Sequence, residues 1–479
     1  MSNKGFNFEH TYAELPNIFY ADQKPAVVPS SQMVVFNSRL SEDLGLDTDI
    51  LKNTPEIFTG STLAMSAKPI AQAYAGYQFG HFAMLGDGRA LLLGEHITPQ
   101  GDKFDIALKG SGLTPYSRGG DGYAALLPML REYIISEAMY YLGVPTTRSL
   151  AVTLTGNDVV REKLLQGAVL TRVASSHIRV GTFNFASAFG CGSDLKTLAD
   201  YCISRHFPWI DKYENKYLLL LREVAMRQAV LIAKWQLLGF VHGVMNTDNM
   251  AISGETIDYG PCAFMDYYDE NTVFSSIDTF GRYAYKNQPT IGAWNLSRLA
   301  EALLPLFCND EDRAIELANE EITNYWLNYK EHWINGMRAR LGLVSSEPDD
   351  RTLASELLEI MSANELDYTS TFRQIALGTE NSEYLNDMPG FSEWQEKWQS
   401  RLSRQPYSMQ HAKEMMRKNN PSVIPRNHKV EEALAAAEYG DYTFMHNFLL
   451  ALRAPYEDSE AYSLPPGPLA RRYKTFCGT

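Results

Sequence analysis

Strand-like patterns of apolar residues dominate the chain before about residue 190, and helical patterns dominate after it. Large apolar side chains occupy every second position from 104 to 108, which predicts a half-buried strand ending at Lys109. We expect further strands over 152–154, 168–173 and 178–185. The first part of the chain is therefore predicted to be rich in β-structure.

Two apolar runs, 81–85 and 90–93, are separated by Gly86-Asp87-Gly88 and are predicted to form a β-hairpin. Glycine at this turn would let backbone N–H groups approach a phosphate without obstruction by a Cβ atom. An ordinary hairpin turn explains the same residues, and Lys109 alone would be interpreted as a surface lysine. Together, however, they follow the order of a protein kinase, in which a lysine after a glycine hairpin contacts the α- and β-phosphates.

The segment 110–122 is a glycine-rich loop of 13 residues. Loops of this length inside a compact domain are usually functional or disordered. Asp121 and Gly122 stand directly before a predicted helix, whose free N–H groups and dipole favour an anion. The competing interpretation is an ordinary turn in which Asp121 caps the helix.

A helix is predicted over 124–142, where apolar residues follow one stripe and Gly143 and Pro145 act as stop signals. Glu132 and Glu137 both lie on this helix. Either could form the ion pair that a kinase makes with its phosphate-binding lysine. Periodicity does not choose between them.

Arg172 and Arg179 bracket the short Ser-containing loop 174–177. Two guanidinium groups at this place could form a fork for phosphate oxygens. The alternative is a pair of surface arginines with weak salt bridges.

Helical patterns cover 193–240, most of 270–390, and 391–439. The longest predicted helix, 216–238, ends at Gly239, as expected for a glycine C-cap.

This helix leads into a stretch with the layout of a protein-kinase catalytic loop. His242 precedes Asn249 by seven residues, as in the motif H-R-D-x-x-x-x-N, and the triplet Asp258-Tyr259-Gly260 replaces D-F-G. Val244 occupies the position of the usual catalytic Asp, and an Asp reappears at position 248. The site is predicted to hold a nucleotide and a metal for a reaction other than ordinary kinase chemistry.

Residues 250–253 and 256–259 are predicted as two strands joined by a turn, which would bring Asn249 and Asp258 together. An amide oxygen and a carboxylate suit Mg²⁺, which prefers oxygen ligands and keeps several waters. Asp248 diverges from its neighbour and would be free to accept a proton from an attacking hydroxyl. A simple Asp-Asn turn is the alternative.

These patterns predict an α+β, protein-kinase-like, two-lobed fold with a small β-rich N-lobe and a large helical C-lobe. An N-terminal extension is expected to wrap the core, and a C-terminal helical extension ends in a Cys-containing tail. The corresponding ranges are 1–60 for the first extension, 61–190 for the N-lobe, 191–390 for the C-lobe and 391–479 for the second extension.

The composition narrows the class of protein. The chain has 479 residues, of which 45% are apolar, so it can bury an extensive core. A net charge of −14 argues against a nucleic-acid partner. The N-terminal residues lack the features of a targeting peptide, no apolar run is long enough for a membrane span, and the five cysteines show no paired spacing. We expect a cytoplasmic protein that binds neither nucleic acid nor membrane and is a monomer.

The motifs above, taken together, resemble the selenoprotein O family over nearly the whole chain. The strings that carry the resemblance are 108–118, 119–122, 242–249, 257–261, Ile424-Pro-Arg-Asn-His428 and the Thr-Phe-Cys ending.

The resemblance implies a pseudokinase fold that binds ATP in a flipped orientation. It implies transfer of AMP to Ser, Thr or Tyr hydroxyls of proteins, with release of pyrophosphate and with Mg²⁺ or Mn²⁺ as the metal. Asp248 matches the family's proposed base, Asn249 and Asp258 match its metal ligands, and Glu132 matches the partner of the lysine. The positions that match nucleotide contacts are Gly86, Gly88, Arg89, Lys109, Asp121, Gly122, Arg172, Arg179 and Asp258.

Cys477 occupies the place where family members carry selenocysteine or cysteine. No second cysteine is placed obviously to pair with it, so a tail disulfide is not expected.

Two other functions use the same residues. The first is a phosphotransferase in which Asp248 replaces the missing loop Asp. The second is a catalytically silent scaffold that binds ATP. Transfer of UMP, the same class of reaction, also stays open.

Overall fold

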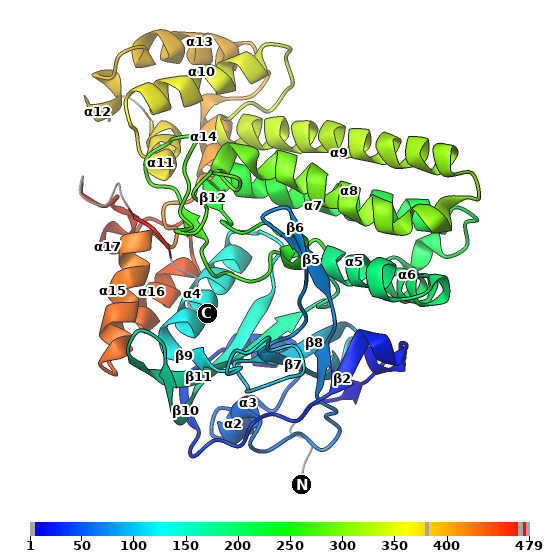
Figure 1. Cartoon of the computed structure of the whole chain (residues 1–479). Coiled ribbons are helices and arrows are strands. Elements are labelled where there is room, and N and C mark those ends of the chain that lie inside the picture. The colour runs from blue at the N-terminus through cyan, green and yellow to red at the C-terminus, as the bar shows by residue number, and fades with distance from the viewer. Residues whose placement is uncertain (1–4, 379–382, 468–472, 476–479) are drawn as a thin grey trace.

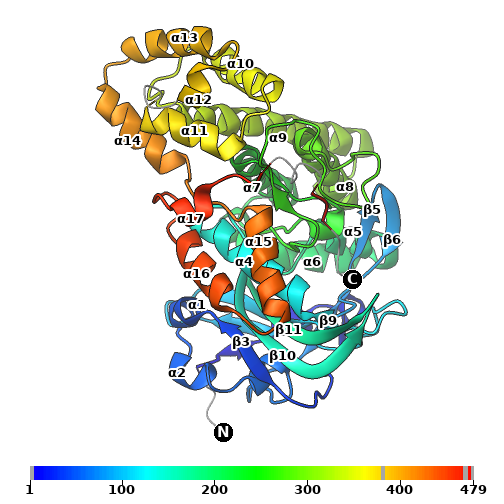
Figure 2. The same ribbon diagram turned by 90° about the vertical axis from the view of Figure 1, so that its left-hand side faces the viewer.

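The computed structural model describes residues 5–378, 383–467 and 473–475. It combines a β-rich N-terminal region with a helical C-terminal region, and this division of the chain agrees with the sequence pattern (Figure 1). Helices α15 (Asn427–Glu438) and α16 (Thr443–Leu452) return to the β-rich region and lie beside α4 (Leu126–Tyr141) (Figure 2).

A nine-stranded sheet forms the centre of the β-rich region. Its main strand order is β2-β4-β7-β8-β11-β10-β3, with β1 paired to β7 and β9 paired to β11. The strands are β1 (Phe8–Glu9), β2 (Tyr20–Asp22), β3 (Gln32–Phe36), β4 (Ile70–Gln72), β7 (Ala90–Ile97), β8 (Lys103–Lys109), β9 (Ala124–Ala125), β10 (Arg148–Val160) and β11 (Leu164–Ala174). The predicted strand 104–109 is confirmed as β8, but it is buried on both faces and not half-buried, because it pairs on both sides and Lys109 lies inside the sheet.

The N-terminal segment is built into this sheet. Strands β1, β2 and β3 all pair with later strands, so these pieces of the N-terminal extension expected over 1–60 are part of the sheet. Three short helices follow, and buried residues of all three pack with the sheet: α1 (Ser38–Asp43), α2 (Thr48–Leu51) and α3 (Glu56–Thr59). Short strands gain their stability from pairing with distant strands, which local periodicity does not reveal.

The predicted hairpin around Gly86-Asp87-Gly88 is wrong. Strand β6 (His81–Met84) pairs with β5 (Ala75–Gln78), whereas β7 pairs with strands of the large sheet. The turn between β5 and β6 is Phe79-Gly80, and both residues have positive φ, of 51° and 89°. Two positive φ angles are what a tight two-residue hairpin needs, but a phenylalanine rarely adopts one, so the sequence signal was weak.

Two other predicted strand segments have a different structure. The apolar run 178–185 lies mostly in helix α5 (Val180–Phe189), because a short apolar run fits a buried helix as well as a strand. Residues 250–259 form no hairpin. Ala251 instead bridges to Arg179, and Thr256 bridges to Thr146. Both bridges join this stretch to the N-terminal region, one between α4 and β10 and the other just before α5.

Most of the rest of the chain is helical, as predicted, whereas residues 240–284 contain only two short strands and a 3₁₀ turn. The long helix α7 (Lys216–Leu238) ends at Gly239, which has a left-handed φ of 70°. The other helices of this region are α6 (Gly192–His206), α8 (Gln288–Phe307), α9 (Glu311–Arg340), α10 (Asp350–Ala363), α11 (Tyr368–Leu377), α12 (Glu383–Asn386), α13 (Phe391–Ser403), α14 (Met409–Asn419) and α17 (Glu460–Ser463). Within the described residues, none of these helices has the length and apolar character that a bilayer span requires.

Arg426 anchors the returning C-terminal helices to the middle of the chain. Its side chain is buried, and its guanidinium donates to Asp367 at 2.9 Å twice and to Asp266 at 2.6 Å. Burial raises the pKa of Asp266 to about 6 against the opposing charge of Arg426. The two carboxylates therefore depend on this one cation.

We expect Arg426→Met to lower the free energy of unfolding by about 3–5 kcal/mol, because it leaves buried carboxylates without their partner. Urea unfolding measures the change. Lys429→Met, in the first turn of α15, is the control: it removes an i,i+3 pair with Glu432 and is expected to cost at most about 0.5 kcal/mol. Equal midpoints for the two variants would contradict the anchoring role.

Candidate active site

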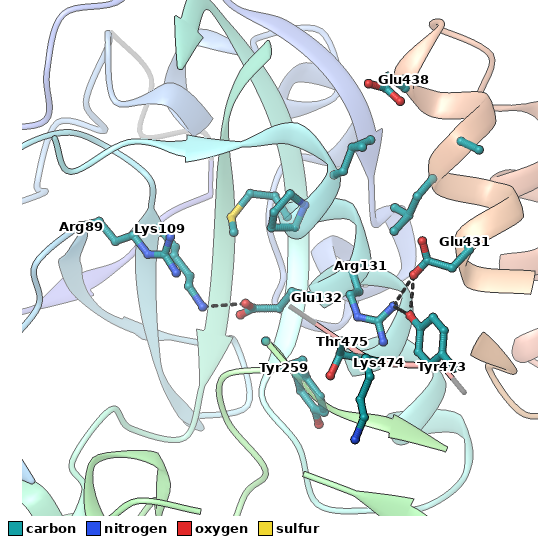
Figure 3. Close-up of a pocket in the computed structure, with 16 residues that line it drawn as sticks. Arg89, Lys109, Arg131, Glu132, Tyr259, Glu431, Glu438, Tyr473, Lys474 and Thr475 are labelled. Atoms are coloured by element: carbon teal, nitrogen blue, oxygen red, sulfur yellow. Dashed lines mark hydrogen bonds and ion pairs between the residues drawn. The ribbon is translucent and has the colours of Figure 1, made fainter. Parts of the chain in front are cut away.

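A cavity of about 330 Å³ opens where the end of β8 meets the loop that follows α7. It brings together residues from distant parts of the chain. The predicted site residues that line it are Gly86, Gly88, Arg89, Lys109, Asp121, Gly122, Arg172, Arg179, Asp248, Asn249 and Asp258. Glu132 lines an adjoining cavity of about 440 Å³, which shares Arg89, Lys109 and Gly260 with the first (Figure 3).

Lys109 forms a buried ion pair with Glu132. Its Nζ lies 2.6 Å from Glu132 Oε2, and Figure 3 shows the two side chains approaching each other from β8 and α4. Glu137, the other candidate, is already paired with Arg148 through both carboxylate oxygens and also accepts from Asn37. The structure thus resolves the choice that periodicity left open.

Asp258 is the carboxylate around which the cations gather. Its Oδ1 lies 2.7 Å from Lys109 Nζ and 2.5 Å from a terminal nitrogen of Arg172, and its Oδ2 lies 3.7 Å from Arg179. Burial opposes ionisation, but Arg172, Lys109 and Arg179 outweigh it and hold the pKa of Asp258 well below its usual range. The residue also has a left-handed φ of 64°, which Asp tolerates better than most residues.

Arg172 and Arg179 are both buried, so their interpretation as surface arginines is wrong. The Arg172 side chain extends from β11 and contacts Glu132 and Asp258. Burial would lower the pKa of Arg172, but the two carboxylates outweigh it and raise the pKa. Arg179 immediately precedes α5 and lies 4.3 Å from the ring centre of Tyr74. Its Nε has no hydrogen-bond partner among the described residues, which leaves a buried donor facing the cavity region.

Asp248 lies in the 3₁₀ turn η4 (Thr247–Asn249) and is buried. Its Oδ1 has no hydrogen-bond partner within the part of the chain that the structure describes. Burial raises the pKa of Asp248 to about 6, against the attraction of Arg179. A buried carboxylate with a raised pKa and an unpaired oxygen is suited to accept a proton.

Asn249 lies next to Asp248 on the same turn and lines the same cavity. Its Nδ2 donates to the carbonyl oxygen of Val244 at 3.0 Å. This bond orients the amide and leaves its carbonyl oxygen as the end that can contact a ligand.

The turn 86–88 and the glycine-rich loop 110–122 are hydrogen-bonded to each other at the cavity. Ser117 Oγ donates to the carbonyl oxygen of Gly88 at 2.5 Å, and Thr114 Oγ1 donates to that of Asp87 at 2.6 Å. A Cβ atom at Gly86 would lie 2.5 Å from the ring of Tyr116. Glycine is therefore required at this position for the close approach of the two loops.

Asp121 is exposed and pairs with Arg161 at 2.7 Å. It does not cap α4, because strand β9 intervenes and the helix begins only at Leu126. Arg89, by contrast, has no carboxylate within salt-bridge distance among the described residues. Arg89 lines both cavities, and no described carboxylate neutralises its charge there.

Sequence reasoning missed several residues that line the cavity: Tyr74, Asp87, Arg118, Arg161 and Tyr123. Arg118 lies in the glycine-rich loop and could have been noticed there. Tyr74 and Arg161 carry no motif and lie at the cavity only because of the tertiary fold. Cys477 lies outside the described residues.

Six basic side chains and four carboxylates line the cavity, an excess of positive charge that favours a polyanionic ligand. The family model described as "Protein adenylyltransferase SelO" matches residues 3–453. The chain belongs to this family.

Curated relatives agree with this assignment. The protein nucleotidyltransferase YdiU of Bacillus cereus (strain AH187) is 58% identical over 99% of both chains. The protein of the same name from Bacillus thuringiensis (strain Al Hakam) is likewise 58% identical over 99% of both. The chain is thus a nucleotidyltransferase, and its family implies ATP as the nucleotide substrate and a protein as the acceptor.

Proposed function

We propose that the chain transfers AMP from ATP to a Ser, Thr or Tyr hydroxyl of an acceptor protein. The observation that carries the proposal is Asp248: a buried carboxylate, with an unpaired oxygen and a raised pKa, at a cavity lined with cations. Such a group can take up the proton that a hydroxyl must lose when it attacks phosphorus.

In the proposed reaction the hydroxyl oxygen attacks the α-phosphorus of ATP. A bond forms between this oxygen and phosphorus, the bond to the β-phosphate bridging oxygen breaks, and pyrophosphate leaves with the electron pair. The hydroxyl proton passes to Asp248. Two buried arginines and Lys109 supply positive charge where negative charge accumulates on the phosphates.

We further propose that Asn249 and Asp258 hold a divalent metal ion, Mg²⁺ or Mn²⁺. The donors fit: Asp258 is ionised, and the oriented amide of Asn249 offers its oxygen. No group of three or more His, Cys, Asp or Glu side chains suited to a metal occurs among the described residues. This suits Mg²⁺, which needs few protein ligands and completes its shell with waters and phosphates. When bound, the ion would neutralise phosphate charge.

We infer a protein-kinase-like arrangement of two lobes around this site. A buried Lys109–Glu132 pair between a central strand and the next long helix supports it, as does the loop that carries Asp248 after α7. The arrangement would explain why a loop with Val244 in place of the usual Asp still lines a nucleotide-sized cavity.

ATP labelled at either the α- or the γ-phosphate tests the reaction. We expect label from the α position to appear on acceptor proteins of a heat-treated cell extract, and none from the γ position. Extract without the enzyme is the control, and mass spectrometry identifies the modified residues.

The other outcomes separate the competing functions. Label from the γ position alone would establish a phosphotransferase. Absence of both labels, together with measurable ATP binding, would establish a silent scaffold. Equal labelling from UTP carrying an α-label would extend the reaction to UMP.

A further inference from the structure

The hairpin β5–β6 leaves the β-rich region and reaches the loop that carries Asp248. In Figure 1 it extends from the lower part of the molecule to the helical part, beside α5. Its strands are not part of the large sheet, and they pair only with each other among the described residues. What the hairpin contacts instead is the turn η4 and its neighbours.

Gly76, in β5, lies directly against the Asp248 carboxylate. A Cβ atom at Gly76 would be 2.2 Å from Asp248 Oδ1 and 2.9 Å from its Cγ. Real Cβ atoms do not approach so closely, so only glycine lets the side chain keep this position. Gly181 of α5 completes the contact, because its Cβ would lie 2.1 Å from the Ala75 carbonyl oxygen and 3.2 Å from Asp248 Cα.

Backbone N–H groups of the hairpin hold the two residues that precede Asp248. The N–H of Tyr77 donates to Thr247 Oγ1 at 2.9 Å, and the N–H of Phe79 donates to Asn246 Oδ1 at 3.2 Å. Asn246 Oδ1 also accepts from the hydroxyl of Tyr283 at 2.5 Å. The segment with the carboxylate is thus fixed from the hairpin on one side and from its own helical region on the other.

We propose that the β5–β6 hairpin is a positioning element for the base, in which Gly76 and Thr247 set the place of the Asp248 carboxylate. The inference rests on the proposed role of Asp248. It explains why Asp248 keeps one oxygen unpaired although it is buried: the surrounding backbone, and not a bond to that oxygen, holds the side chain. An acceptor hydroxyl then meets a base whose position depends on contact between two regions of the chain.

Gly76→Ala tests whether the absence of a side chain at position 76 sets the place of the Asp248 carboxylate. Gly76 has no positive φ, so Ala is compatible with the backbone and only the new methyl group must be accommodated. We expect kcat for α-label transfer to fall about 100-fold, since displacement of a reacting group by about 1 Å has this effect. The KM for ATP should stay within about twofold, because the phosphate-facing cations are untouched.

Gly192→Ala is the matched control. This glycine also lacks a positive φ and has no heavy atom within 4 Å of the place of a Cβ, so kcat should equal that of the unmodified enzyme. Melting temperatures of both variants show whether the loss in Gly76→Ala is one of folding.

Thr247 provides a second test that adds no bulk. Thr247→Val keeps the shape and removes the acceptor for the Tyr77 N–H, and we expect kcat to fall roughly tenfold with the KM for ATP unchanged. Thr247→Ser keeps the hydroxyl and should restore kcat. If Thr247 only stabilised the fold, Thr247→Val and Thr247→Ser would have the same kcat at a temperature well below the melting temperatures of both variants.

Asp248→Asn separates failure of this inference from failure of the proposed function. If Asp248→Asn is inactive while Gly76→Ala and Thr247→Val behave like Gly192→Ala, the positioning role is wrong and the base remains. If Asp248→Asn is active, Asp248 is not the general base, and the proposed positioning role of the hairpin is wrong as well.

Discussion

Asp258→Asn is expected to lower the rate of α-label transfer at least about 1000-fold and to destabilise the protein. The Asp258 carboxylate faces Lys109, Arg172 and Arg179, and the substitution removes its charge while keeping its shape. Glu132 is then the remaining carboxylate of the group, paired with two buried cations. Breaking a buried charge group in this way costs about 3–5 kcal/mol of unfolding free energy.

Initial rates at saturating ATP and urea unfolding measure the two effects. Asp49→Asn is the control for removal of a carboxylate, because Asp49 is exposed and, within the described part of the chain, has its one ion pair with Lys52. Titration with Mg²⁺ and Mn²⁺ tests the metal. If Asp258→Asn kept full activity with either ion present, the assignment of Asp258 as a metal ligand would be wrong.

Asp248→Asn is expected to reduce kcat by a factor of about 100 to 10,000, the usual contribution of a general base. An amide of the same shape cannot accept the hydroxyl proton. ATP binding should persist, since the ion pairs around Lys109 do not involve Asp248. Equilibrium binding of ATP and single-turnover rates measure the two separately.

The free energy of unfolding should fall for Asp258→Asn but not for Asp248→Asn. Burial raises the pKa of Asp248 above that of an unfolded Asp, so its ionised form is less favourable in the folded protein at pH 8. Replacing it with neutral Asn removes this cost, and the urea midpoint at pH 8 should be equal or higher. A lower midpoint, comparable to that of Asp258→Asn, would contradict the conclusion that burial of the Asp248 carboxylate outweighs the attraction of Arg179.

Local patterns predicted the elements whose formation depends on neighbouring residues. The alternation in β8, the apolar stripe of α4 and the run of α7 up to Gly239 are all present where expected. They were predictable because the apolar residues of a helix or a strand repeat with a characteristic period along its own sequence.

Local patterns failed where a short segment could adopt more than one structure. The run that became α5 carries too few residues to distinguish a helix from a strand. The turn Phe79-Gly80 was overlooked because Gly86-Asp87-Gly88 is the stronger turn signal. That glycine turn instead packs against Tyr116 of a second loop.

The sequence by itself determined the division into β-rich and helical regions, the position of Lys109 at a strand end, and the resemblance that named Asp248, Asn249 and Asp258. The tertiary structure decided which glutamate meets Lys109, that Arg172 and Arg179 are buried beside Asp258, and that Gly76 lies against Asp248. The physical reason is distance along the chain. Charge pairing and burial depend on contacts between separate segments, which are 23 residues apart for Lys109 and Glu132 and 86 apart for Arg172 and Asp258. Periodicity reports only on a residue's own segment.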